Sequence, residues 1–497
     1  MFWVILSVTS VTLLYFYLTW NYNYWRNRGI NGPKPRPLVG TFPKSAIYLR
    51  NFVYELDDIY KTFRGKCPFV GIYTYRQPEL LILDPKLINE IFVGKFKHFE
   101  NNYTNYNKEN ARLFMRNPFI LRDQEWKDNR ADISPAFTTL KTKQTYPVVD
   151  RMCKKLTKFI KSQIENGVPF TDTKEITAKF TADVICSVAY GLEANAIENN
   201  NSEFLRVAHK LFATSNWKLW FITFKSIFPY LFKYYEMPFL AADVEKYFLN
   251  LTDEAIRIRS QSVNKPDDYL HFLLKLKEKR NFQLNDVAAH SITFFLDAYE
   301  TSSIILTHAL YRLAKNENCQ RKLRQEIAEL NGDLSFDSLS NLSYLDQVFN
   351  ETLRISTPGF TMSKVCTEKI DLLNHENRPV TIEKDTVIHI PIYSIHNDPE
   401  YFPEPTIFNP DRFKFADLKS LRDNGLFFPF GHGPRMCLGM RFSTLQIKAA
   451  IAEIVSNFHI SVNARTKEPI IVKPKDFLYL AIGEVYLDYK VIEKENK

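Results

Sequence analysis

The chain has 497 residues, enough to bury a large active site, and its 45% apolar content is ordinary for a globular protein. The net charge of +9 comes from basic residues spread along the chain. This excludes the clustered basic surface of a nucleic-acid-binding protein and fits an anionic membrane surface or an acidic partner. The six cysteines lie far apart with no C-x-x-C pair, so neither a disulfide framework nor a zinc site is predicted, and a reducing compartment is favoured.

Residues 1–25, "MFWVILSVTSVTLLYFYLTWNYNYW", carry no charged side chain. About 20 apolar residues cross a bilayer as a helix, and the aromatic residues at the far end are typical of a membrane interface. The segment 26–37 is basic and proline-rich, which by the positive-inside rule puts the rest of the chain in the cytosol. We predict a membrane anchor over 1–25 and a stiff hinge over 26–37. A cleaved signal peptide or a buried core helix is the alternative for the first segment.

Helical patterns dominate the rest of the chain. Residues 281–315 contain neither Gly nor Pro, and their middle is apolar almost all round, which predicts a long helix through the interior. The patterns of 316–330 and 340–355 predict shorter amphipathic helices.

Two segments have strand patterns. Residues 70–83, "VGIYTYRQPELLIL", predict a β-hairpin, and 378–393, "RPVTIEKDTVIHIPIY", predict further strand. Because no repeat or low-complexity linker interrupts 38–497, we predict one mainly α catalytic domain with a smaller β region.

Two helical segments pair polar residues at helical spacing. Glu351 and Arg354 in "ETLR" share a helix face, and Arg412 in "PDRF" offers a second cation for the same carboxylate. Trp126 and Arg130 lie one helical turn apart, so their side chains can contact the same group. Taken in isolation, each pair would equally fit an exposed helix surface.

The long helix carries polar residues among apolar neighbours: Asp297, Glu300 and Thr301. A buried acid is costly unless it is paired or functional. An acid that is capped or that reaches the surface is the alternative here.

The loop "FFPFGHGPRMCLGMRF", residues 427–442, contains the pattern F-x-x-G-x-R-x-C-x-G, with Phe430, Arg435 and Cys437 at its fixed positions. With this loop the chain resembles the cytochrome P-450 family of haem-thiolate monooxygenases. The resemblance follows family order from anchor and proline hinge to W-x-x-x-R, the acid–threonine helix, E-x-x-R and P-D-R-F. Segments such as "SPAF", "ETSS" and "PFGHGPRMCLG" make it most similar to microsomal animal members, above all those of insect detoxification.

The resemblance implies the cytochrome P-450 fold and haem b (iron protoporphyrin IX) as cofactor. Cys437 becomes the metal ligand, since a thiolate pushes electron density onto iron and favours O–O cleavage. Glycines and the start of the following helix direct N–H groups at its sulfur. The implied cofactor-binding residues are Cys437, Arg435, Arg130, Trp126, Phe430 and Lys364. Many relatives have arginine in place of Lys364. Lysine keeps the positive charge but lacks the planar guanidinium that can donate two parallel hydrogen bonds to one carboxylate.

By the same resemblance, Glu300 and Thr301 are catalytic, because a hydroxyl beside an acid can organise proton delivery. A glycine and a small residue that relatives carry here are Ala298 and Asp297 in this chain. We consider three roles for Asp297: an ester with haem, recognition of a polar or cationic substrate end, or a buried acid held by its neighbours.

The implied function is insertion of one oxygen atom from O₂ into an apolar small molecule, either a xenobiotic or an endogenous lipid or hormone. No G-x-G-x-x-G motif is present, so electrons come from NADPH through a separate flavoprotein reductase, with cytochrome b5 as a second candidate donor. The implied location is the endoplasmic reticulum membrane with a cytosolic catalytic domain. A haem-thiolate isomerase or dehydratase that needs neither O₂ nor reductase is the alternative. Nine aromatic residues in 217–235 predict a lid dipping into lipid, although an ordinary helical core fits as well.

Overall fold

The structure is a computed structural model that describes residues 1–104, 112–168, 170–212, 215–232, 238, 240–262, 266–476 and 485–493. The helices are α1 Phe2–Thr19, α2 Phe52–Phe63, α3 Pro85–Asn89, α4 Asp123–Ile133, α5 Thr139–Glu165, α6 Thr173–Tyr190, α7 Glu203–Phe212, α8 Asn216–Ile227, α9 Ala242–Gln261, α10 Tyr269–Arg280, α11 Leu284–Lys315, α12 Glu317–Ala328, α13 Phe336–Ser340, α14 Ser343–Ile355, α15 Ile392–His396, α16 Leu418–Asp423 and α17 Met440–Asn457. The strands are β1 Phe69–Thr74, β2 Gln77–Ile82, β3 Asn101–Asn102, β4 Phe170–Asp172, β5 Met362–Val365, β6 Ile370–Leu373, β7 Pro379–Ile382, β8 Val387–Ile390, β9 Phe458–Val462 and β10 Tyr486–Val491. The prediction of a mainly α chain with a smaller β region is confirmed.

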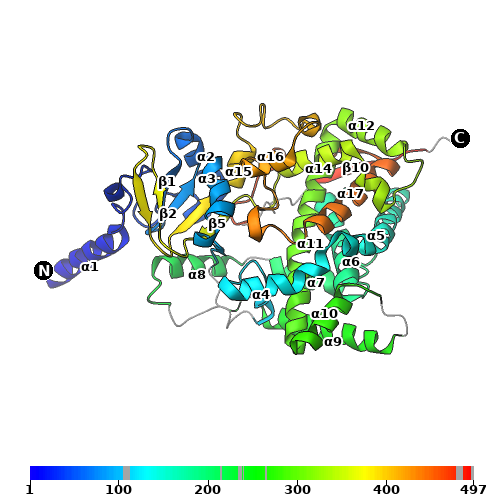
Figure 1. Cartoon of the computed structure of the whole chain (residues 1–497), viewed down its shortest axis with the longest axis horizontal. Helices are drawn as coiled ribbons and strands as arrows, with labels where there is room; N and C mark the ends of the chain where they lie inside the picture. Colours follow the sequence, from blue (N-terminus) through cyan, green and yellow to red (C-terminus); the bar gives the residue numbers. More distant parts are fainter. Residues whose placement is uncertain are drawn as a thin grey trace.

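Helix α11 runs through the middle of the helical part of the molecule (Figure 1). It begins at a capping box, in which the side chains of Gln283 and Asp286 each bond the other's backbone N–H. The long interior helix predicted over 281–315 is therefore confirmed, with its start at Leu284. The predicted shorter helices correspond to α12 and α14, and the short α13 precedes α14.

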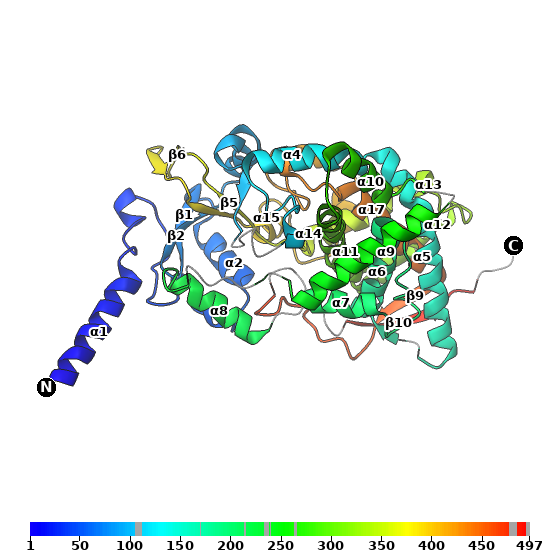
Figure 2. The same ribbon diagram turned by 90° about the horizontal axis from the view of Figure 1, so that it is seen from below.

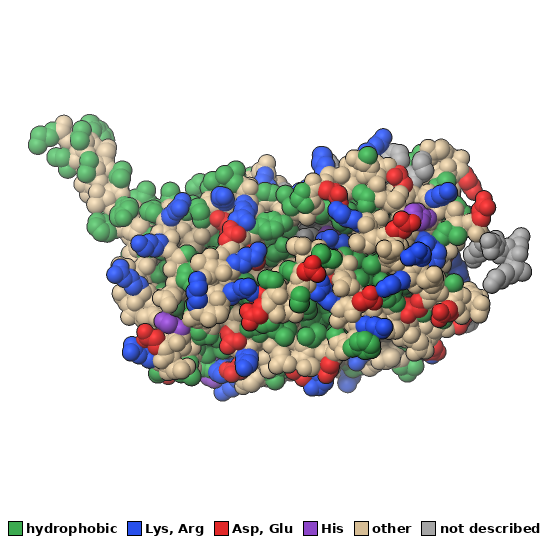
Figure 3. All heavy atoms as spheres, turned by 90° about the horizontal axis from the view of Figure 1, so that it is seen from above, with side chains coloured by type: hydrophobic (Ala, Val, Ile, Leu, Met, Phe, Trp, Pro, Cys, Tyr) green, Lys and Arg blue, Asp and Glu red, His purple; other side chains and the backbone are tan. Residues whose placement is uncertain are grey.

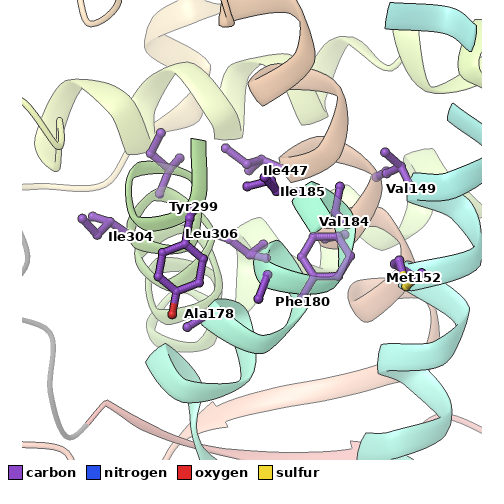
Figure 4. Close-up of a cluster of buried hydrophobic side chains, with 14 of the residues drawn as sticks. Val149, Met152, Ala178, Phe180, Val184, Ile185, Tyr299, Ile304, Leu306 and Ile447 are labelled. Carbon is purple, nitrogen blue, oxygen red and sulfur yellow. The ribbon is translucent and has the colours of Figure 1, made fainter. Parts of the chain in front are cut away.

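Helices α5, α6 and α17 pack with α11 around one apolar core (Figure 4). Figure 4 shows Met152 of α5, Phe180 of α6, Leu306 of α11 and Ile447 of α17 converging. All four are fully or almost fully buried. Each such side chain stabilises the fold by about 1.5–3 kcal/mol relative to exposure, so this cluster holds α11 in place.

A five-stranded sheet of order β1-β2-β8-β5-β3 forms the second part of the fold. The hairpin predicted over 70–83 is confirmed, because β1 and β2 pair antiparallel from Phe69↔Ile82 to Thr74↔Gln77. The strand pattern of 378–393 is also confirmed, as β7 and β8. The remaining strands form a sheet of order β4-β10-β9 and the pair β6-β7.

Helix α1 projects from the end of the molecule that carries β1 and β2 (Figures 1 and 2). It has a mean hydropathy of 1.7 and is only 6% buried, so its length and composition fit a membrane span. Trp25 is buried, and its ring lies where a Cβ on Gly71 of β1 would stand. Gly71 also donates its N–H to the carbonyl of Asn31 at 2.8 Å. Trp25 and Asn31 thus pack against β1, so the segment between α1 and the sheet is in contact with the sheet at these two residues.

Candidate active site

The cysteine loop is held in one conformation by its backbone. The N–H of Cys437 donates to the carbonyl of Phe430 at 2.9 Å. Gly433 has a φ of +70°, and a Cβ at this position would lie 2.1 Å from the carbonyl oxygen of Phe92. Only glycine fits both demands, which explains why the loop needs it at this point.

The thiol of Cys437 lies deep in the protein and yet faces open space. Burial raises its pKa to about 11, while backbone hydrogen bonds from Gly439 and Met440 and the charge of Arg130 act in the opposite direction. The side chain nevertheless has a large exposed surface, so the sulfur lines a space inside the fold. Metal coordination removes a thiol proton outright, which would overcome the effect of burial.

Asp297 of α11 faces the same internal space. Its side chain has accessible surface although it lies deep inside the fold. Burial raises its pKa to about 7, and a hydrogen bond from Asn117 opposes this rise. The amide of Asn117 donates to Oδ1 of Asp297 at 3.1 Å. The charge of Asp297 contributes to the raised pKa of Cys437, so the two side chains lie within electrostatic range of each other. Helix α11 and the cysteine loop therefore face each other across the site.

Trp126 and Arg130 both lie on α4, one turn apart, and both contact residues of the cysteine loop. Arg130 donates to the carbonyl of Met436 at 2.6 Å. The guanidinium of Arg435 stacks 4.1 Å from the centre of the Trp126 ring. Arg435 also donates to the carbonyl of Pro118 at 2.9 Å, and burial lowers its pKa to about 10.

Lys364 on β5 is the most isolated buried cation of the site. Its side chain is 1% exposed, and Nζ is buried without a hydrogen-bond partner. Burial and the neighbouring charge of Arg435 lower its pKa to about 7, against a weaker opposing effect of Glu100. A buried ammonium without a partner is costly, and an anion that is not a protein side chain would stabilise its charged form.

Glu300 and Thr301 lie next to each other on α11 but make different contacts. Glu300 is buried and pairs through Oε1 with Nζ of Lys174 at 2.8 Å. The hydroxyl of Thr301 donates to the backbone carbonyl of Asp297 at 2.5 Å. The carboxylate is thus neutralised from α6, while the hydroxyl stays beside Asp297.

Glu351, Arg354 and Arg412 form a buried network, as the resemblance implies. Arg354 binds both carboxylate oxygens of Glu351 at 2.8 Å, and both side chains are fully buried. Arg412 adds a contact of 3.2 Å to the same carboxylate. The ring of Phe430 in the cysteine loop stacks 6.4 Å from Phe349 of α14, so the network's helix also supports the loop.

Sequence reasoning missed Asn117 and Lys174. Asn117 lies 180 positions before its partner Asp297. Lys174 belongs to α6, and nothing in its surrounding sequence points to α11. The buried acids of α11 were a signal that partners must exist, but only the folded chain identifies them.

One thiol that faces Asp297 of an otherwise mainly apolar helix and lies near three cations fits a haem-thiolate site. The thiol would supply the axial ligand, and the unpartnered ammonium of Lys364 and the guanidinium of Arg435 would face the carboxylates of the haem propionates.

Comparison with known proteins agrees with this geometry. The cytochrome P-450 family model matches residues 30–486. The chain is 36% identical to probable cytochrome P-450 28a5 of Drosophila melanogaster, over 98% of this chain and 99% of the relative. It is 31% identical to cytochrome P-450 6j1 of Blattella germanica, over 97% and 96%. It is also 31% identical to cytochrome P-450 6A1 of Musca domestica, over 99% and 98%.

The chain belongs to the cytochrome P-450 family. It is therefore a monooxygenase with haem b as its cofactor, held by a cysteine thiolate, and it has insect relatives along its whole length. Members of the family use redox partners and apolar substrates in general.

Proposed function

We propose that the chain is a membrane-anchored monooxygenase that uses Cys437 as the iron ligand and oxidises apolar small molecules. The observation that carries this proposal is the position of the Cys437 thiol, which is deep in the fold, open to an internal space and opposite Asp297. Residues 1–25 form the anchor, 26–37 the basic connection and 38–497 the catalytic domain. Haem bound at Cys437 supplies activation of O₂.

The remaining site residues hold and orient the cofactor. Arg130, Arg435 and Lys364 provide positive charge for its two propionates, and Trp126 fixes the plane of Arg435 by stacking. Phe430 supports the loop from behind through its contact with α14. The Glu351 network serves folding and cofactor retention, because it is buried and makes its contacts within the protein.

Thr301 and Glu300 organise proton delivery in this proposal. The Thr301 hydroxyl lies beside Asp297, where it can pass a proton towards the space above Cys437. Glu300 must release its ion pair with Lys174 before it can exchange a proton.

Asp297 is positioned to select substrates. Its carboxyl is held at one oxygen by Asn117, and the side chain still has exposed surface towards the space opposite Cys437. Recognition of a polar or cationic substrate end fits this geometry. Acid extraction followed by mass measurement of the polypeptide tests the alternative of a haem ester, since an ester would leave the haem mass on the chain.

Electrons reach the site from NADPH through a flavoprotein reductase, with cytochrome b5 as a second candidate donor. Exposed Arg441, in the first turn of α17, lies just beyond the cysteine loop and belongs to no ion pair among the described residues. A basic surface beside the thiolate suits an acidic electron donor.

The proposed location is the endoplasmic reticulum membrane, with the catalytic domain on the cytosolic side. Helix α8 lies on the side towards which α1 projects, and apolar side chains gather along that edge (Figures 2 and 3). Trp217, Trp220 and Phe224 of α8 are exposed, which supports a lid that contacts lipid. Of the predicted lid aromatics, Tyr234 and Tyr235 lie outside the described residues. Tyr17 of α1 stacks 5.7 Å from Phe228, directly after α8.

The membrane orientation is tested by glycosylation. Asn102, Asn200, Asn250, Asn341 and Asn350 each begin an N-x-S/T sequence. On the cytosolic side all five remain unmodified in native membranes. A glycan on any of them contradicts the orientation.

The reaction is tested by turnover of the full chain with NADPH and a purified reductase, omitting one component at a time. A monooxygenase needs O₂, NADPH and reductase together. Turnover without any of them would instead support an isomerase or dehydratase, which the adjacent Glu300 and Thr301 argue against.

A further inference from the structure

A second cavity lies behind the cysteine loop and is separate from the site between Cys437 and α11. Its volume is about 430 Å³. Phe430 and Met436 of the loop and Met440 of α17 line it, but Cys437 and the residues of α11 do not. The loop therefore lies between this cavity and the space that the Cys437 thiol faces.

The inner wall of this cavity is apolar. Phe349 of α14, Phe427 and Leu339 are buried lining residues, and Leu445 of α17 completes the floor. Small-molecule sites have volumes of roughly 300–1,000 Å³ with mainly hydrophobic walls and a few polar groups. The cavity meets that description and can take a single aliphatic chain or a small aromatic body.

Three of the four charged residues that line the cavity are cations. Lys448 is neutralised by Asp346 at 2.7 Å. Arg422 and Arg441 also line the cavity, and neither belongs to an ion pair among the described residues. Nη1 of Arg422 lies 4.0 Å from the sulfur of Met436, which places this charge against the cysteine loop. Two arginines beside an apolar chamber favour a ligand with one anionic end and one apolar end.

We propose that this cavity binds a free single-chain amphipathic carboxylate, with its chain against Phe349 and Leu445 and its carboxylate on Arg422 and Arg441. A small inorganic anion would leave the apolar wall unfilled, and a neutral amphiphile would leave the arginines without a partner. The proposal does not depend on the substrate oxidised at haem. Because Arg441 also lies on the surface assigned to the electron donor, an occupied cavity competes with the donor if that assignment holds.

The experiment uses the full-length haem protein with 4-phenylimidazole bound at iron, so that the substrate side is blocked. Photoreactive dodecanoate is cross-linked, the labelled peptides are identified by mass spectrometry, and competition by dodecanoate is compared with competition by dodecanol. We expect labels on peptides from α14, α16 and α17. Removing the charge of the ligand or of both arginines should weaken binding by about 10- to 100-fold, the range for charge-assisted hydrogen bonds.

Three variants separate charge, space and folding. The double variant Arg422→Gln/Arg441→Gln should lose the preference for dodecanoate over dodecanol. Thr444→Trp fills the cavity from α17 and should abolish labelling although both arginines remain. Arg257→Gln removes an exposed arginine of α9 and should change nothing. The carbon monoxide spectrum of each reduced variant verifies that the haem site is folded.

Several results would overturn the proposal. Equal competition by dodecanol and dodecanoate, or labelling confined to α11, contradicts it. Labelling that survives in folded Thr444→Trp also contradicts it. If none of the carboxylate binds but Thr444→Trp slows reduction by the reductase, the cavity belongs to the protein interface instead.

Discussion

The side-chain amide of Asn117 donates a hydrogen bond to Oδ1 of Asp297 over 3.1 Å, joining the segment before α4 to the middle of α11. Asn117 is fully buried, and its own Oδ1 accepts from the N–H of Phe119 at 2.7 Å. The side chain of Asn117 is thus held in place through its oxygen, while its nitrogen bonds the carboxyl of Asp297. Asp297 is a positioned carboxyl directed at the site, and its ionisation can be changed through a single neighbour.

Replacing Asn117 by Ala should shift the pH dependence of ligand binding. Burial raises the pKa of Asp297 to about 7 and the Asn117 bond opposes that rise, so losing the bond moves the pKa further up. A cationic ligand binds better to the charged carboxylate, so its affinity should rise with pH and the midpoint should move to higher pH in the variant. Difference spectra of an amine-bearing ligand give this midpoint. An unchanged midpoint, or one that persists in Asp297→Asn, rules out Asp297 as the titrating group.

Replacing Lys364 by Arg should flatten the pH dependence of haem retention. Burial and Arg435 lower the pKa of Lys364 to about 7, and two propionates beside it would favour the charged form and raise that pKa. Haem binding by the native chain therefore takes up a proton above pH 7, and affinity should fall by about tenfold per pH unit there. Arginine stays charged throughout this pH range, so the Lys364→Arg substitution removes the part of the pH dependence that comes from residue 364.

The measurement is haem transfer to apomyoglobin between about pH 7 and pH 9, where linkage to Lys364 is greatest. The Lys364→Arg protein should lose haem at a rate that changes less with pH than the rate of the native protein. Titration of the thiol affects both proteins alike and cancels in the comparison. Parallel pH profiles would exclude Lys364 from the propionate contacts.

The Thr301→Ala variant should consume NADPH but release peroxide in place of product. The lost hydroxyl lies beside Asp297 on the open side of α11, whereas haem retention depends on other residues. Ser303→Ala is a matched control, because Ser303 also bonds a backbone carbonyl of α11, that of Glu300 at 3.0 Å, but is buried. The ratio of product to NADPH consumed distinguishes them. Equal coupling in the two variants removes Thr301 from proton delivery.

Glu351→Gln should strongly destabilise the fold. The fully buried Arg354 would lose its charged partner, and breaking a buried pair costs about 3–5 kcal/mol. Glu203→Gln removes a partner at the same spacing on the exposed face of α7, where the bond to Arg206 is 3.0 Å long, and should cost less than about 1 kcal/mol. Urea unfolding of both variants gives the loss in the free energy of unfolding for each. A cost for Glu351→Gln as small as the control's would contradict its role in holding the fold.

Local patterns predicted those parts of the fold that depend on local sequence. The run without Gly or Pro predicted α11, and the alternation around residues 70–83 predicted the β1–β2 hairpin. The pattern of the cysteine loop indicated the family, but the close approach of Gly433 to the carbonyl of Phe92 joins distant segments and is seen only in the folded chain. The contacts of Asp297 and Glu300 join distant segments, so no local pattern indicates Asn117 or Lys174. The burial of Trp25 against Gly71 likewise follows from tertiary packing, which an apolar run near a membrane does not predict.

The most direct test of the account is the spectrum of the reduced protein with carbon monoxide, compared between the native chain and Cys437→Ser. Thiolate ligation gives the red-shifted band by which this family is recognised. We expect that band in the native protein and its loss in the serine variant. Cys366→Ser, at a buried cysteine on the sheet side of the fold, is the matched control and should keep the band. If Cys437→Ser keeps the red-shifted band, Cys437 is not the iron ligand.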